Sequence, residues 1–524
     1  MLAFSKSGAL LGIDARPIHI EVDVSQGLPG FHIVGLPDGA VRESRERVRA
    51  AIKNCGYSFP VQKITVNLAP ADVKKDGAGL DLPIAAAILS ATKVIPADSL
   101  KDTILAGELS LDGSLRKIRG ALPLALGAGR WGEQRLLLPE ENAPEAAVAD
   151  IPVYAVSHLS EVVEFLGGRR NLAPVSCDRQ ALLNRKDQAH DLDWQDVTGQ
   201  QTAKRAMEIA AAGGHNIIMA GPPGSGKTML ARRLPTILPS MSFHEALETS
   251  AIYSVAGLTS EKEPLITRRP FCAPHHTISD AGMIGGGTIP RPGQVSLAHN
   301  GVLFLDELPE FRKNVLESLR QPMEDGAVTI SRASTTVTFP ARFMLVAAQN
   351  PCPCGFLGDE RRECVCSPAQ IARYRDRISG PLSDRIDIQI EVPAVPYQEL
   401  SSASVSHSES SREVRQRVEA ARRIQIARFS QKTAGISTAE NSGTSRCNAH
   451  MSAAEIRAYC TLEPKDRGFM EEAAARMGLS ARAFHKILKI ARTIADLEGA
   501  AEIGRLHLAE ALQYRCLDRS NRLP

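Results

Sequence analysis

The feature that most constrains the fold is a glycine-rich loop between an apolar run and a helix-like run. The loop reads GPPGSGKT; it follows the apolar run at 216–220 and precedes MLARRL at 229–234. In this context the pattern fits the P-loop, whose backbone N–H groups surround the phosphates of a nucleotide at a helix N-terminus. The sequence therefore predicts an α/β fold that binds ATP. The residues expected to contact the nucleotide are Gly221, Pro222, Pro223, Gly224, Ser225, Gly226, Lys227 and Thr228.

A pair of carboxylates follows a second apolar strand downstream of this loop. The strand is predicted at 302–305, and Asp306 and Glu307 come directly after it. We expect Thr228 and Asp306 to hold Mg²⁺, while Lys227 reaches the β- and γ-phosphates and Glu307 acts as general base toward the attacking water. An acidic pair after a strand is also a common helix N-cap. The P-loop upstream favours the catalytic interpretation.

Two further positions complete the set expected around the γ-phosphate. The run FMLVAA predicts a third strand, and Asn350 follows it as the expected sensor of the γ-phosphate. Arg385, in LSDRIDI, is a candidate to reach the nucleotide of a neighbouring subunit and stabilise transition-state charge. A salt bridge to Asp384 or Asp387 is the alternative for this arginine.

Three other arginines are weighed with these positions. Arg320 and Arg377 are the alternatives if the arginine that reaches the neighbouring subunit is not Arg385. Arg482, in LSARAF, is a candidate second sensor that would close a helical lid over bound nucleotide. A plain solvated helix residue is the alternative for Arg482.

Composition narrows the class of protein further. The 524 residues, of which 43% are hydrophobic and 23% charged, predict a folded protein of about three domains at roughly 150 residues each. No stretch approaches the roughly 18 apolar residues of a membrane span, and no basic region precedes the short apolar run at the N-terminus, so we expect a cytoplasmic protein without a membrane partner. A net charge of +3 does not diagnose nucleic-acid binding, and aromatic residues at 4% give little support to a base-stacking platform.

Local patterns divide the chain into segments. Residues 1–168 alternate strand-like and helix-like runs, which predicts an α/β domain. We expect a polar linker at 169–190, a second α/β domain at 191–395, a polar and basic linker with one helix at 396–450, and an α-helical domain at 451–524. The segment 412–432 carries seven Arg or Lys against two Glu, so DNA contact and an ordinary solvated helix both stay open.

Four cysteines form the pattern C-x-C-x9-C-x-C. They are Cys352, Cys354, Cys364 and Cys366. Because a reducing compartment disfavours disulfides, four thiolates here indicate a tetrahedral Zn²⁺ site, although C-x-C is tighter than the usual spacing. The alternative is a loop of reduced thiols near Asn350. A second pair of potential ligands, His275 and His276, would face opposite sides of an extended strand, which disfavours chelation and leaves a structural or substrate-coupling role.

The nucleotide motifs belong to longer stretches with a family resemblance. Together with FCAPHHTISDAGMIGGGTIPRPGQVSLAHNGVLFLDELPEF and LVAAQNPCPCG, they resemble the magnesium-chelatase-like AAA+ proteins of the ComM/YifB type along the whole chain. The resemblance implies a hexameric, Mg²⁺-dependent ATPase that moves on DNA, acts in branch migration during recombination or natural transformation, and has recombination proteins as partners. It also implies a helical lid at the C-terminus. One departure is Cys272, where the family pattern FRxPHH has arginine.

The resemblance also implies two DNA-facing elements. The segment VTISRASTTVTF, 328–339, alternates like a hairpin with Arg332 near its turn. In the family this hairpin grips DNA, which makes Arg332 a candidate contact; an inert exposed arginine is the alternative. The glycine run 285–287 would face the pore of the ring, or would be a surface loop.

The N-terminal segment resembles the Lon protease domain, in GELSLDGSLRKIRGALPLALGAG and KKDGAGLDLPIAAAIL. That family cleaves peptides with a Ser-Lys dyad. Alignment of KDGAG with the protease's KDGPS places Gly79 at the serine, and alignment of KIRGAL with PIGGLK places Leu122 at the lysine. Both catalytic groups are missing, so we expect no protease activity, and a role in shaping the ring or carrying nucleic acid.

Three functions remain in competition at this point. The first is a hexameric DNA motor. The second is a magnesium-chelatase motor subunit that works on a porphyrin with protein partners, and the third is an ATP-driven adaptor that remodels or regulates other proteins. Hydrolysis stimulated by DNA distinguishes the first function from the other two.

Overall fold

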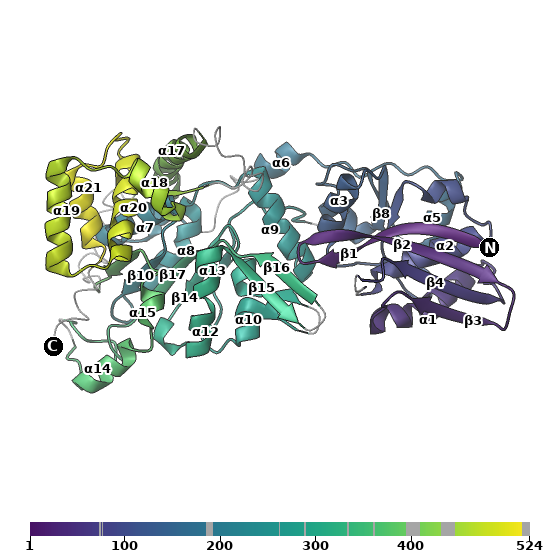
Figure 1. Cartoon of the computed structure of the whole chain (residues 1–524), viewed down its shortest axis with the longest axis horizontal. Coiled ribbons are helices and arrows are strands. Elements are labelled where there is room, and N and C mark those ends of the chain that lie inside the picture. The colour runs from purple at the N-terminus through teal and green to yellow at the C-terminus, as the bar shows by residue number, and fades with distance from the viewer. Residues whose placement is uncertain are drawn as a thin grey trace.

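The computed structural model describes residues 1–72, 75, 77–184, 192–260, 262–287, 290–332, 335–359, 362–394, 409–430 and 446–515. The described residues contain two large sheets with helices around them, three two-stranded ribbons, and a group of helices toward the C-terminus (Figure 1). No helix among these residues is long and apolar enough to cross a membrane. The expected mixed α/β class is confirmed.

A seven-stranded mixed sheet forms the core of the N-terminal unit, by which we mean the described residues of 1–184. Its strand order is β3-β4-β2-β1-β5-β8-β9. Pairs β1/β2 and β2/β4 are antiparallel, and the other neighbours are parallel. The strands are β1 (Leu2–Leu11), β2 (Asp14–Ser25), β3 (Gly30–Val34), β4 (Lys63–Ala69), β5 (Thr103–Leu105), β8 (Arg135–Pro139) and β9 (Val153–Val156). A separate short ribbon pairs β6 (Glu108–Leu109) with β7 (Leu115–Arg116).

Helices form two buried clusters with this sheet. One cluster contains residues of α1, α2 and α5, and the other contains residues of α3 and α4. All residues of α2 are buried, including Asp81, whose carboxylate accepts a 2.7 Å hydrogen bond from Arg47 on α1. The helices are α1 (Gly39–Asn54), α2 (Asp81–Ala91), α3 (Ala121–Arg130), α4 (Ala143–Ala146), α5 (Leu159–Leu166) and α6 (Arg179–Asn184).

A five-stranded parallel sheet forms the core of the P-loop unit, the described residues of 192–394. Its order is β11-β14-β17-β10-β18. The strands are β10 (Ile217–Ala220), β11 (Phe271–Cys272), β14 (Val302–Leu305), β17 (Met344–Gln349) and β18 (Ile388–Glu391). Strands β10 and β14 are buried along their whole length, as apolar runs in a parallel sheet covered on both faces should be. The predicted strand at 302–305 is confirmed.

Helices and two small hairpins surround this sheet. Hairpin β12 (Gly285–Gly286) with β13 (Arg291–Pro292) precedes β14, and hairpin β15 (Ala327–Arg332) with β16 (Thr335–Pro340) precedes β17. The predicted hairpin at 328–339 is confirmed, with Val328 opposite Phe339; its turn residues 333–334 lie outside the described residues. The helices are α7 (Gln201–Gly213), α8 (Lys227–Ile237), α9 (Phe243–Ala256), α10 (Asp280–Ile284), α11 (Gln294–Leu297), α12 (Lys313–Ser318), α13 (Arg320–Asp325), α14 (Pro368–Arg375) and α15 (Gly380–Ser383).

The C-terminal helices pack onto the P-loop unit. They are α17 (Ser411–Ser430), α18 (Ala453–Tyr459), α19 (Pro464–Met477), α20 (Ala481–Leu497) and α21 (Arg505–Gln513). Helix α20 begins after the N-cap Ser480 and buries Ile487, Ile490, Ala491 and Ile494, which form one face at helical spacing. These residues belong to the same buried cluster as β10 and α8. The P-loop strand and the C-terminal helices therefore share one core.

Helix α17 is a packed helix inside the segment expected as a linker. It buries Val414, Val418, Ala421 and Phe429 in the cluster that it shares with α7, α8 and α20. Residues 395–408 and 431–445 on either side of α17 lie outside the described residues, as do 185–191. The expected boundaries at 168, 190, 395 and 450 stay predictions.

The N-terminal unit contacts the P-loop unit at two places. At the first, Leu122 of α3 is fully buried beside Met241 and Ala246, and its N–H lies 3.4 Å from the hydroxyl of Ser254 on α9. The N–H of Gly120 donates to the carbonyl of Ser254 at 3.0 Å. Apolar burial and backbone hydrogen bonds thus act together across this contact.

The second contact is made by the turn between β1 and β2. Leu11 and Ile13 pack against the cluster that contains Val337 of β16. Between them, Gly12 has a φ of +69°, and a Cβ at this position would lie 2.9 Å from the carbonyl oxygen of Thr338. Only glycine suits both the backbone conformation and the close approach.

Candidate functional site

The P-loop lies between β10 and α8, as predicted. A Cβ at Gly221 would lie 2.1 Å from the carbonyl oxygen of Val392, so this position needs glycine for the close approach. Gly224 and Gly226 have φ of +77° and +91°, a conformation that other residues rarely adopt. The glycines therefore determine the conformation of this loop.

Lys227 is held inside the loop by oxygen atoms. Its Nζ donates to the carbonyls of Gly221 and Pro222 at 2.7 and 2.8 Å, and lies 3.3 Å from the hydroxyl of Ser225. Burial lowers the pKa of Lys227, and the nearby Asp306 carboxylate opposes this. Backbone oxygens take the place of water around this ammonium. The phosphate oxygens of a nucleotide are charged, so they would bind it more strongly.

Thr228 and Asp306 meet at the carboxyl edge of the sheet. The hydroxyl of Thr228 donates to the Asp306 carboxylate at 2.7 Å. Oxygen ligands of this kind suit Mg²⁺, so Thr228 and Asp306 would hold the ion, and its charge would offset that of the phosphates. The residues present therefore fit the expected ATP and Mg²⁺, and the two expected metal ligands already lie side by side.

Glu307 has an unusual backbone and a histidine partner. Its φ is +52°, which is uncommon outside glycine and is concentrated at functional sites. The side chain is 55% exposed, and its Oε2 lies 3.5 Å from Nδ1 of His276. His276 follows β11, and Glu307 follows the neighbouring strand β14. The two residues lie close together because the carboxyl ends of parallel strands meet at one edge of the sheet. His276 thus lies where it can orient Glu307.

The two histidines are not placed as the sequence suggested. Strand β11 ends at Cys272, so His275 and His276 lie in the following turn, and their ring centroids are 4.1 Å apart. The premise that the two rings point to opposite sides of a strand was therefore wrong. No metal-ligand cluster among the described residues includes them. The signal that would have identified His276 is the position of its segment beside β14, the strand that Asp306 and Glu307 follow.

Replacement of His276 by alanine should slow ATP hydrolysis by roughly 10-fold or more, since misplacement of a reacting group by about 1 Å can cost 100-fold. The KM for ATP should be nearly unchanged, because the loss affects the orientation of Glu307 and not the P-loop. His276→Asn should recover part of kcat. Steady-state kinetics of the purified variants measures both constants.

The matched control is His275→Ala. His275 hydrogen-bonds Thr277 through Nδ1 at 2.9 Å and makes no ion pair with Glu307 among the described contacts. Its removal should change kcat little. Equal reductions of kcat in the two variants would contradict a specific role for His276.

Asn350 follows β17, which lies between β10 and β14 in the sheet. The N–H of Gly221 donates to the carbonyl of Gln349 at 3.2 Å, so the end of β17 is tied to the start of the P-loop. Asn350 therefore follows the strand between the P-loop and the carboxylates, where a sensor of the γ-phosphate was expected. Its role stays a prediction.

The candidate arginines for the neighbouring subunit all have partners within the chain. Arg385 is 13% exposed; it contacts Glu324 at 2.5 Å, not the Asp384 or Asp387 considered from the sequence, and donates to the carbonyl of Pro381 at 2.7 Å. Arg320 pairs with Glu317 at 2.6 Å, and Arg377, which is 50% exposed, pairs with Glu310 at 2.9 Å. Arg385 would have to leave Glu324 to reach another subunit.

Arg482 is exposed in the first turn of α20. Among the described contacts none joins it to the P-loop. Its expected role as second sensor stays a prediction.

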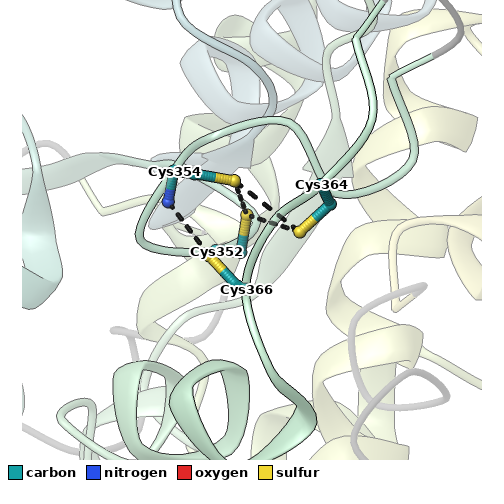
Figure 2. Close-up of side chains that lie close together, drawn as sticks. All are labelled: Cys352, Cys354, Cys364 and Cys366. Carbon is teal, nitrogen blue, oxygen red and sulfur yellow. Dashed lines mark hydrogen bonds between the residues drawn. The ribbon is translucent and has the colours of Figure 1, made fainter.

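The four cysteines come together in one loop (Figure 2). Their sulfur atoms all lie within 4.8 Å of one another. The backbone N–H of Cys354 donates to the sulfur of Cys366 at 3.4 Å. Further backbone donors at Phe356 and Val365 help to lower the pKa of Cys354 to about 6, which favours its thiolate.

The two inserted hairpins lie against each other. A Cβ at Gly285 would lie 3.0 Å from the Ile330 side chain of β15, and one at Gly286 would lie 3.5 Å from Nη2 of Arg332. Gly286 is paired with Arg291, and both Arg291 and Arg332 are exposed. The glycine run is thus part of a hairpin. Sequence reasoning missed Arg291 because its strand is only two residues long.

The basic run on α17 is largely used inside the molecule. Arg415 donates to the carbonyl of Thr236, and Arg417 pairs with Glu208 at 2.6 Å. Arg422 donates to the carbonyl of Ala211 at 3.0 Å, and Arg428 binds Asp496. These contacts favour a structural use of the run over DNA contact, although Arg412 and Arg423 are exposed.

The two positions aligned with the protease dyad lie beside apolar side chains. Gly79 is in the short helix η1 (Ala78–Leu80), and a Cβ there would lie 3.7 Å from Ile118. Leu122 is buried at the contact with the P-loop unit. A lysine at position 122 would therefore place an ammonium in this apolar contact.

The strand order places β17 between β10, which precedes the P-loop, and β14, which precedes Asp306, and it is consistent with a P-loop protein of the AAA+ type. Three family models match: "Subunit ChlI of Mg-chelatase" at 20–142, "Magnesium chelatase, subunit ChlI" at 193–400, and "Magnesium chelatase, subunit ChlI C-terminal" at 408–515. The chain belongs to the ComM/YifB type of magnesium-chelatase-like proteins.

Relatives match along the full length. The protein YifB of Salmonella typhimurium is 44% identical over 99% of this chain and 98% of its own. The competence protein ComM of Haemophilus influenzae is 45% identical over the same shares. A Lon protease of Trichlorobacter lovleyi is 26% identical over 30% of this chain and 20% of its own length. The resemblance to Lon seen in the sequence is therefore a partial one.

Proposed function

We propose that this chain is an ATP-driven motor that works on DNA as a homo-hexamer, in branch migration during recombination or natural transformation. Its layout would be a Lon-protease-like N-terminal domain without protease activity, an AAA+ core and a helical lid, in the cytoplasm. The observation that carries the proposal is the joint placement of two features in one unit. These are the nucleotide site at the sheet edge and two exposed arginines on adjacent hairpins.

Several observations support hydrolysis as the driving reaction. Thr228 and Asp306 are in hydrogen-bond contact, Lys227 is desolvated within the P-loop, and Glu307 has a histidine at its carboxylate. In the proposed reaction Glu307 orients the attacking water and accepts its proton, while Asn350 senses the γ-phosphate. Arg385 of an adjacent subunit would offset the charge that develops.

The support for DNA comes from the hairpins and from a relative. Arg332 and Arg291 are exposed at the ends of hairpins that touch each other. Guanidinium groups suit phosphate oxygens, and the relative ComM is named for competence. In a ring, this pair would face a DNA strand threaded through the pore.

The experiment measures steady-state ATP hydrolysis without DNA, with single-stranded DNA and with a branched duplex. Branched DNA should raise the rate of the wild type. If no DNA changes the rate, a motor on DNA is excluded and an adaptor for other proteins becomes the better proposal.

The Arg291→Ala/Arg332→Ala double variant should bind DNA more weakly, and the slope of log affinity against log salt should fall by about one for each DNA phosphate that an arginine no longer neutralises. The measurement is fluorescence anisotropy of labelled DNA over a salt series. Arg476→Ala on α19, whose side chain is 78% exposed, is the control and should leave the slope unchanged. An unchanged slope in the double variant would show that these arginines do not contact DNA phosphates.

A chelatase motor subunit is the competing function, since the matching family models carry that name. The full-length relatives reported above do not carry it. The DNA experiment separates the two, because metal insertion into a porphyrin has no need of DNA.

A further inference from the structure

The loop between β17 and α14 has neither regular secondary structure nor much apolar burial to stabilise it. Residues 350–359 and 362–367 contain no helix or strand, and most of their side chains are partly or fully exposed. Val365, between two of the cysteines, is 85% exposed. Apolar burial therefore contributes little here, and segments of this kind are commonly stabilised by a disulfide or a metal.

The sulfur geometry favours a metal. Cys352 Sγ lies 3.4 Å from Cys354 Sγ and 3.6 Å from Cys364 Sγ, and Cys354 Sγ lies 3.6 Å from Cys364 Sγ. A disulfide needs about 2.05 Å. A tetrahedron with Zn–S bonds of about 2.3 Å has edges of about 3.8 Å, close to these separations. The Cys354 N–H, which donates to the Cys366 sulfur, would stabilise a thiolate at Cys366.

The loop also touches the nucleotide site. Gly355 lies against the P-loop, where a Cβ at this position would be 2.7 Å from Pro223 and 3.9 Å from the side chain of Asn350. The N–H of Gly355 donates to the carbonyl of Cys352 at 3.0 Å, which ties the contact to the cysteines. A change in the position of the sulfurs would therefore shift the turn 352–355, which contacts the P-loop.

We propose that Cys352, Cys354, Cys364 and Cys366 bind one structural Zn²⁺ ion, which fixes the loop that follows Asn350 against the P-loop. Each thiol that binds as thiolate releases its proton to solvent, and no oxidation or reduction takes place. The site is closed by four protein ligands, so the metal has no open position for catalysis. Its effect on hydrolysis is through the position of Asn350 and Pro223.

The first test is the metal content of the reduced protein, purified from zinc-supplemented culture and measured for zinc and iron by mass spectrometry. We expect about one zinc per chain. The Cys354→Ser/Cys364→Ser variant should lose it, whereas Cys55→Ser/Cys177→Ser, with both changes in the N-terminal unit, should keep it. A wild type without zinc, a variant that retains it, or iron in its place would overturn the proposal.

A second measurement avoids any failure of the variant to fold. Co²⁺ added to chelator-treated, reduced wild type should produce the thiolate charge-transfer and d–d absorption of a tetrahedral sulfur site. A spectrum without these bands would also overturn the proposal. Metal content and spectrum need neither ATP nor DNA, so they stand apart from the proposed motor function.

The coupling to hydrolysis is tested with a zinc-selective chelator in excess Mg²⁺. The kcat for ATP should fall, and added Zn²⁺ should restore it. Hydrolysis that persists after complete removal of zinc would overturn the link to the P-loop while leaving the metal site intact.

Discussion

ATP hydrolysis by the Glu307→Gln variant should fall by about 10²- to 10⁴-fold, the range that loss of a general base produces. The glutamine keeps the size of the side chain and removes the carboxylate that would accept the proton. ATP affinity should be retained, because the backbone N–H groups of the P-loop, Lys227 and Thr228 are unchanged. Single-turnover hydrolysis and equilibrium binding of a fluorescent nucleotide measure the two properties separately.

Two comparisons make this result specific. Lys227→Ala should lose nucleotide binding itself, since it removes the ammonium that would contact the phosphates. Glu471→Gln on the exposed face of α19 has the same chemistry and should leave hydrolysis unchanged. Hydrolysis by Glu307→Gln at the wild-type rate would show that another group serves as base.

The Asp496→Asn variant should lower the free energy of unfolding by about 3–5 kcal/mol, the cost of removing one partner from a buried ion pair. Asp496 is completely buried on α20. It binds Arg428 of α17, Arg492 of its own helix at 3.1 Å, and Asn448 of η7 (Asn448–His450) at 2.8 Å. Asparagine would leave two arginines without a countercharge in a dry site.

Tryptophan fluorescence offers a local measurement of this destabilisation. The chain has two tryptophans, and Trp194 belongs to the buried cluster that contains α20. In a Trp131→Phe background, denaturant unfolding followed at Trp194 reports on this core. Glu472→Gln is the control; its exposed pair with Arg476 should contribute less than about 1 kcal/mol. A similar shift for both substitutions would show that the buried network is not the cause.

The nucleotide site was predictable because its motifs are local. A glycine loop, a following lysine and an acidic pair after an apolar strand carry their geometry within a few residues, and β14 has the predicted bounds. Asn350 could be assigned a position because β17 is also an apolar strand that ends in a polar residue.

Other features depend on contacts that no local pattern contains. Strand β1 was missed because its buried side chains are Ala3, Ser5, Ser7 and Ala9, whereas Phe4 points outward with 53% exposure. In a usual half-buried strand the large apolar side chains face the core, but in β1 the small side chains do so, because they lie under α2. The contact of His276 with Glu307 could not be predicted, because it depends on β11 lying beside β14. The structural use of the α17 arginines could not be predicted either, because it depends on carbonyls from distant parts of the chain.

The contact at Gly12 has a mechanical consequence. The tip of β1 and β2 rests on β16 with no room for a side chain between them. A displacement of the β15–β16 hairpin would therefore also displace this tip and, through β1 and β2, the seven-stranded sheet to which both strands belong. Residues at opposite ends of β1 and β2 should therefore change their hydrogen exchange together if nucleotide binding displaces the β15–β16 hairpin.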